Sequence, residues 1–476
     1  MPDLILEEYN VLGSVVTIVD SDGKGLYIIK DPQLSPKELE IINEILDEVY
    51  SNTKSLTDAE MRLMEILAKR DLDPKLADKA VLLFKKRILY DEITIPMIDP
   101  DVEEIECTGP GLPITVIHRK YSNYMRLYTN IVLPKEENVI KILEKLATKS
   151  NKSVNIARPY LEFSLDEGHR VTATISKEIS NPGSTFDVRK FPISPLSLIK
   201  LIKMKSLSVE IASYLWFLMD YKPFYLIVGS TGSGKTTFLN ALLNFTNPDS
   251  KVLSIEDTPE LNLVRKNWIR LFTRQSVSSN FDVSVNDLSR LALRYRPDYL
   301  IIGEVRGKEI ETLIHAAASG HASLSTFHGA KPADVITRVA SLLPKDLAIM
   351  FLANVWGFII VGRRVTEDGK ITKAINAIYE TTRTKGKTKF RKIVWWSFKN
   401  NKYSPSDLNT LVTRSSLLLK ISHYYGLTQK EILDELNERV EFIKSLLSSN
   451  TIDNEIVQEE IGKFYRSRKL NVTSAV

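Results

Sequence analysis

Four runs of consecutive apolar residues stand in the middle of the chain, separated by stretches with helical periodicity. They are Phe224–Val228, Val252–Ile255, Tyr299–Ile302 and Ala322–Phe327. Short continuous apolar runs are typical of strands that are buried on both faces. Because these runs alternate with helical stretches, the pattern predicts an α/β domain with a mostly parallel sheet.

The first 195 residues show shorter strands and helices in mixed order. The pattern predicts a small mixed module over residues 1–90, with strands at 15–19 and 25–29 followed by helices beginning near 36, 57 and 74. A second α+β domain, of PAS-like type, is expected over 91–195. Two prolines within Phe191–Pro195 mark the expected linker to the next domain.

The last quarter of the chain predicts a β-hairpin and then helices. Strands are expected at 372–379 and 389–396, and helices at 415–425, 428–446 and 454–465. We therefore place the α/β domain at 196–404 and a helical extension at 405–476. The basic and aromatic segment Lys385–Lys402 is open to three interpretations: a packed hairpin, which we favour, a nucleic-acid contact or a docking face.

A phosphate-binding loop follows the first of the four apolar runs. Its residues match the pattern G-x-x-x-x-G-K-[S/T] and lead into a helix through Thr237; they are Gly229, Ser230, Thr231, Gly232, Ser233, Gly234, Lys235 and Thr236. Glycines let backbone N–H groups approach phosphate oxygens, and the helix N-terminus adds a positive dipole end. Lys235 is expected to reach the β- and γ-phosphates, and the Thr236 hydroxyl to bind Mg²⁺. These features predict binding of ATP and Mg²⁺.

Polar groups follow the other three apolar runs, at the strand ends where a parallel sheet binds its ligands. Glu304 is the candidate that orients the attacking water. Glu256 and Glu260 are candidates to hold Mg²⁺-bound waters, and Asp257 is a further candidate. His328 is expected to contact the γ-phosphate.

Several residues are interpreted as structural. Asp298 precedes its strand and should lie at the opposite edge of the sheet, so we exclude it as a metal ligand. His321 is open between a functional role and a role in shaping the turn. The remaining histidines show no metal-ligand spacing, and Cys107 is expected to be a small buried residue.

Composition adds limits rather than a function. The net charge of +5 over 476 residues does not by itself indicate a nucleic-acid or membrane partner. A single cysteine excludes a disulfide framework within the chain, which fits a reducing compartment. We expect neither a signal peptide at Met1–Asn10 nor a membrane-spanning segment.

Three motifs together resemble those of the secretion ATPase superfamily, which powers type II secretion, type IV pili and archaeal surface filaments. Ile255–Leu261 resembles its Asp box, Leu293–Arg306 its Gly-Glu form of Walker B, and Gly320–His328 its His box. Upstream, Asp99–Glu104 and Gly168–Thr174 resemble the N-terminal half of archaeal members. The resemblance covers about residues 1–400 and implies a RecA-like core.

The resemblance also implies an assembly. Members are homo-hexamers that work in the cytoplasm, peripherally at the inner face of the cell membrane, on a polytopic membrane platform protein. Arginines of the N-terminal domain complete the nucleotide site, and position matching offers Arg170 and Arg189, with Arg158 behind them.

The resulting hypothesis is an ATP-hydrolysing motor for pilus-like filament assembly or secretion. The alternatives are an ATP-driven nucleic-acid motor and a nucleotide-gated scaffold with little turnover. Because Lys235, Thr236, Glu304 and His328 form a complete hydrolytic set, a scaffold is disfavoured. We expect no nucleic-acid partner.

Overall fold

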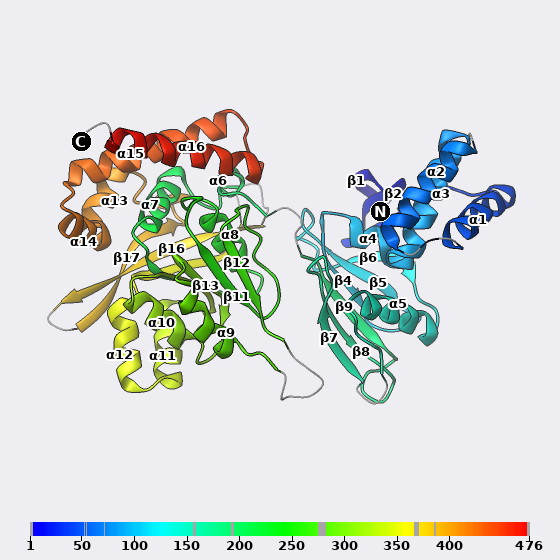
Figure 1. Cartoon of the computed structure of the whole chain (residues 1–476), viewed down its shortest axis with the longest axis horizontal. Coiled ribbons are helices and arrows are strands. Elements are labelled where there is room, and N and C mark those ends of the chain that lie inside the picture. Colours follow the sequence, from blue (N-terminus) through cyan, green and yellow to red (C-terminus); the bar gives the residue numbers. More distant parts are fainter. Residues whose placement is uncertain are drawn as a thin grey trace. The chain divides into compact units, whose positions relative to one another are not determined.

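The computed structural model describes residues 3–51, 53, 55–70, 72–155, 159–191, 195–274, 282–365, 371–384 and 387–473. The chain forms two compact units, Met1–Ile193 and Ser194–Val476 (Figure 1). The linker predicted at 191–195 spans this division, and its residues 192–194 lie outside the described part of the chain.

The first unit is built on a nine-stranded sheet in the order β1-β2-β3-β6-β5-β4-β9-β8-β7. All pairs are antiparallel except β3 with β6. The strands are β1 (Leu4–Val11), β2 (Ser14–Ser21), β3 (Lys24–Lys30), β4 (Val102–Cys107), β5 (Pro113–His118), β6 (Leu127–Val132), β7 (Tyr160–Ser164), β8 (Arg170–Thr174) and β9 (Thr185–Arg189). Strands from both predicted N-terminal modules thus share one sheet and one apolar core.

Five helices accompany this sheet in the described part of the first unit, besides one short 3-10 turn. They are α1 (Pro36–Tyr50), α2 (Leu56–Lys69), α3 (Pro74–Ile88), α4 (Thr94–Ile98) and α5 (Glu136–Lys149). Helix α1 begins where the sequence predicts it, because Ser35 and Glu38 exchange the two hydrogen bonds of a capping box and Pro36 fits the first turn. Helices α1–α3 enclose a small apolar core of their own.

The second unit contains a sheet in the order β12-β11-β13-β14-β10-β15-β16-β17-β18. Pairing is parallel from β12 to β15 and antiparallel from β15 to β18. The parallel strands are β10 (Phe224–Gly229), β11 (Val252–Glu256), β12 (Trp268–Phe272), β13 (Tyr299–Val305), β14 (Ala322–His328) and β15 (Gly357–Val365). The others are β16 (Ile371–Thr384), β17 (Lys387–Ser397) and β18 (Lys402–Ser404). The α/β fold is confirmed, and the sheet is parallel only in the part that carries the predicted site.

Helices cover both faces of this sheet, as Figure 1 shows. One apolar core joins the sheet to the first group of helices, and a second core joins its other face to the second group. The first group is α6 (Leu198–Lys203), α7 (Val209–Met219), α8 (Lys235–Leu243), α13 (Leu408–Arg414), α14 (Ser416–Tyr425), α15 (Gln429–Ser448) and α16 (Asn454–Thr473). The second is α9 (Val285–Ala292), α10 (Ile310–Ala318), α11 (Pro332–Leu342) and α12 (Lys345–Asn354).

The C-terminal helices are bonded to the rest of the second unit through buried polar contacts. The Arg439 side chain is 1% exposed and pairs with Asp220 at the end of α7, at 2.5 Å. Tyr465 on α16 accepts a hydrogen bond from the Trp216 indole at 2.8 Å. Gln458 donates to the carbonyl of Asn244, which ends the helix after the phosphate loop. Because removing one partner of a buried ion pair is costly, these contacts hold the helices firmly on α7 and α8.

The described helices include none that is long and apolar enough to cross a membrane.

Candidate functional site

The loop after β10 has the backbone of a phosphate cradle. Strand β10 is buried along its whole length, and helix α8 begins at Lys235. Gly232 and Gly234 have φ values of +69° and +91°, a region that disfavours residues with a Cβ. Lys235 is 9% exposed, and its Nζ donates to the carbonyl of Ser230 at 3.1 Å, which draws the ammonium group across the loop.

Parallel pairing brings the predicted residues of three strands to the same edge of the sheet. His328 is the register partner of Gly229, the first residue of the loop. On the next strand, Glu304 is the register partner of Thr326. Strand β14 lies between β10 and β13, so His328 lies between the loop and the strand that carries Glu304.

One carboxylate contacts the Thr236 hydroxyl, the expected Mg²⁺ ligand, and a second carboxylate contacts the backbone of the residue that carries the first. The hydroxyl donates to Glu260 at 2.8 Å. Glu256 accepts hydrogen bonds through Oε1 from the backbone N–H groups of Glu260 at 2.9 Å and Leu261 at 2.8 Å. These contacts join Thr236, Glu260 and Glu256 into one chain of interactions. Asp257 accepts instead from Thr273.

Glu256 has an orphaned oxygen that suits a metal-bound water. Its Oε2 is buried and has no hydrogen-bond partner, although Oε1 has two. A hard cation such as Mg²⁺ prefers oxygen ligands and keeps several of its waters, which donate to nearby carboxylates. The residues present therefore fit Mg²⁺. Burial raises the pKa of Glu256 to about 7, and the two backbone N–H groups partly oppose that shift.

This pKa shift predicts a pH-dependent stability. Between pH 4.5 and about 7, Glu256 ionises in the unfolded chain but keeps its proton in the folded chain. Its contribution to the free energy of unfolding is therefore fully present below this pH window and is lost as the pH rises through it. A shift of this size corresponds to up to about 3 kcal/mol. Thermal melts at pH 4.5 to 8 should therefore show the wild type losing stability relative to Glu256→Gln. Parallel pH profiles of the two proteins would contradict this assignment.

Glu304 has a partner that sequence reasoning missed. The Arg306 guanidinium binds Glu304 Oε2 through Nε at 2.8 Å and through Nη2 at 2.5 Å. The carbonyl of Arg306 in turn accepts from Arg338 at 2.9 Å. The available signal was the spacing, since residues two apart at the end of a strand project to the same side. Arg306 therefore orients the carboxylate of Glu304.

The residues interpreted as structural have local partners. His321 Nδ1 lies 2.7 Å from the carbonyl of Pro297, a contact that shapes the turn before β14. Asp298 lies at the opposite edge from the loop, where it accepts from Lys222 and from the backbone of Lys251, both at 2.9 Å. Cys107 is buried, and burial raises its pKa to about 11.

The two arginines matched to the family's N-terminal domain lie side by side in the first unit. Arg170 on β8 and Arg189 on β9 are register partners. Arg170 forms an ion pair with Glu162, and Arg189 one with Glu104 at 3.8 Å. Arg158 lies outside the described residues.

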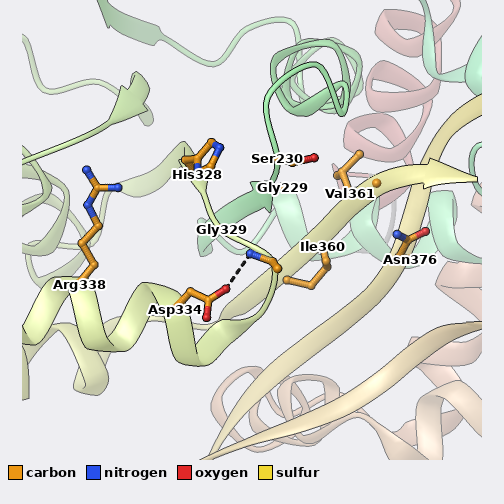
Figure 2. A pocket seen from close by; sticks show the side chains of 11 residues that line it. Gly229, Ser230, His328, Gly329, Asp334, Arg338, Ile360, Val361 and Asn376 are labelled. Carbon is orange, nitrogen blue, oxygen red and sulfur yellow. Dashed lines mark hydrogen bonds between the residues drawn. The ribbon is translucent and has the colours of Figure 1, made fainter.

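A pocket of about 600 Å³ opens beside the start of the loop (Figure 2). His328, Asp334 and Arg338 line one part of it, and β15 lines another with Ile360 and Val361. Asp334 accepts from the backbone N–H groups of Ala330 and Lys331, which fixes the start of α11. The pocket gives solvent and ligands access to His328 and Ser230.

Comparison with known proteins decides the family. Residues 130–381, more than half of the chain, match the model of the type II/IV secretion system protein family. The chain belongs to this family. It is an ATP-hydrolysing motor of the type that serves secretion or pilus assembly.

Relatives of this secretion ATPase include proteins of archaea and bacteria. An uncharacterised protein of Methanocaldococcus jannaschii is 29% identical over 442 residues, covering 90% of this chain and 79% of that one. VirB11 of Agrobacterium fabrum is 36% identical over 119 residues, covering 25% and 35%. Among solved structures, the pilus retraction motor PilT with bound ADP is 19% identical with a TM-score of 0.44, covering 73% and 92%.

Proposed function

We propose that residues 229–237 of this secretion ATPase bind ATP with Mg²⁺ and that the edge of the sheet around them hydrolyses it. The observation that carries the proposal is the strand register, with His328 opposite Gly229 and Glu304 one strand further along the same edge. A triphosphate held by the loop would extend its γ-phosphate toward these two side chains.

Each group has a distinct task in this proposal. Backbone N–H groups of the loop and the Lys235 ammonium bind the phosphates and stabilise the charge that develops on them. Glu304 orients the attacking water, and Arg306 holds the Glu304 carboxylate in place. His328 contacts the γ-phosphate and responds to its loss. Bound Mg²⁺ would neutralise charge on the β- and γ-phosphate oxygens, with Thr236 as its ligand and Glu256 and Glu260 holding its waters.

Arg170 and Arg189 are proposed to act on the same nucleotide. The support is the family resemblance together with their adjacent positions on β8 and β9. A guanidinium near the transferring phosphoryl group stabilises its negative charge. Alanine at either position should lower kcat more than it weakens ADP binding.

We further propose that the chain works as a homo-hexamer in the cytoplasm, peripherally at the membrane, on a polytopic platform protein. Turnover would drive the assembly of pilus-like filaments or secretion. Membership of the family supports this proposal.

The proposed function is tested by measuring ATP turnover at different hexamer fractions and after adding membranes, double-stranded DNA or single-stranded DNA. We expect ATPase activity to rise with the fraction of hexamer, which light scattering measures. Activity should rise further when membranes that contain a platform protein of the same system are added. Double-stranded and single-stranded DNA should leave turnover unchanged at 50 and 200 mM salt. Stimulation by DNA that weakens steeply with salt would instead favour a nucleic-acid motor.

A further inference from the structure

The β15–β16 hairpin carries two cationic side chains next to the phosphate loop. Arg363 on β15 and Lys373 on β16 are direct register partners. Side chains of directly opposed residues in an antiparallel pair project from the same face. The hairpin therefore presents both cations together, on one side of the sheet.

The two side chains lie against the glycines at the turn of the loop. A Cβ built on Gly232 would lie 3.0 Å from Arg363 Nη2. A Cβ built on Gly234 would lie 3.3 Å from both Cβ and Cδ of Lys373. Both glycines have positive φ values, so the loop turns at the positions that the cations approach. With Lys235, three cationic side chains surround one loop whose chemistry suits an anion.

The residue that follows Arg363 on β15 anchors this strand inside the unit. Arg364, the neighbour of Arg363, is 4% exposed and stacks on Trp396, with its guanidinium carbon 3.5 Å from the ring centroid. It also donates to the carbonyl of Lys205. Anchoring Arg364 inside the unit therefore fixes the part of β15 from which Arg363 reaches the loop.

Strand order indicates which part of a nucleotide these cations would meet. Strand β10 lies between β14 and β15, and the side chains proposed to face the γ-phosphate come from β14 and β13. The hairpin lies on the other side of β10, where β15 pairs with β10 from Tyr225 to Val228. A nucleotide whose γ-phosphate points toward His328 must extend its remaining groups away from β14.

We propose that Arg363 and Lys373 form a second wall of the nucleotide site, which binds the α-phosphate and sugar side of ATP and ADP. This inference rests on the proposed function of the phosphate loop. The two residues bind and orient the nucleotide and take no part in the bond-breaking step. Their removal therefore weakens affinity and leaves the rate at saturation nearly unchanged.

Titration calorimetry with ADP, AMP and pyrophosphate tests this inference on the full chain. The variant Arg363→Ala/Lys373→Ala should bind ADP and AMP roughly tenfold or more weakly, as expected when charge-assisted contacts are lost. Pyrophosphate, which lacks both the sugar and the α-phosphate of ATP, should lose less affinity. The kcat at saturating ATP should stay within about twofold of the wild type. The single variant Arg363→Lys, which keeps the charge, should bind ADP more tightly than the double alanine variant.

Lys389→Ala is the matched control, because Lys389 is an exposed cation on β17, two strands away from β15. Lys389 pairs with Thr382, which lies nine residues along β16 from Lys373. At the usual rise per residue of a strand, Thr382 and Lys373 are about 30 Å apart. Wild-type affinity for ADP in the double variant, or an equal loss for pyrophosphate and ADP, would overturn the inference. Full ADP affinity in Lys235→Ala would instead contradict the proposed function itself.

Discussion

Replacing Lys235 with alanine is expected to reduce ATP hydrolysis by roughly 10³-fold or more, because the cation that stabilises the transferring phosphoryl group is lost. Lys235 is nearly buried, and its Nζ already lies across the loop on the carbonyl of Ser230. The ammonium group therefore lies at the loop that is proposed to bind the phosphates. Phosphate release at saturating ATP measures the effect.

The control for this variant lies at the other end of the same strand. Lys222 precedes β10 and pairs with Asp298 at 2.9 Å, on the edge of the sheet opposite the loop. Lys222→Ala removes the same charge and should retain hydrolysis within about twofold, since surface ion pairs contribute little. Undiminished turnover in Lys235→Ala would refute the assignment of the phosphate loop.

Glu304→Gln is expected to retain ATP binding and to lower kcat by roughly 10²- to 10⁴-fold, the range usual for a lost acid–base group. Glutamine preserves the shape of the side chain but cannot accept a proton from water. It also weakens the contact with Arg306, which binds the carboxylate through two nitrogens. Rapid-mixing measurements of nucleotide binding and single-turnover hydrolysis separate the two effects.

Glu311→Gln is the corresponding control, since Glu311 is a partly exposed carboxylate on α10 that pairs with His315 at 3.7 Å. It should leave both binding and turnover unchanged. A further comparison with Arg306→Ala tests the positioning role: that variant should lower kcat less than Glu304→Gln and leave the KM for ATP nearly unchanged. Normal hydrolysis by Glu304→Gln would exclude Glu304 as the group that orients the water.

The parts of the fold that depend on local pattern were predictable. Apolar runs located β10, β11, β13 and β14, and the turn chemistry of Ser35 located the start of α1. Strands β7, β9 and β12 were not predicted, because their exposed and partly buried residues leave no continuous apolar run. The same reason explains β1, which lies at the edge of its sheet and carries exposed residues such as Leu4 and Ile5.

The sequence by itself determined the chemistry of the site, because the loop motif and the polar residue after each strand are local signals. Only the tertiary structure placed β14 between β10 and β13, paired Glu304 with Arg306 and brought Arg363 and Lys373 to the loop. It also bonded the C-terminal helices to α7 through Arg439 and Asp220. Such contacts join residues far apart in the chain, and the free energy that selects them comes from packing the whole unit, which no local pattern records.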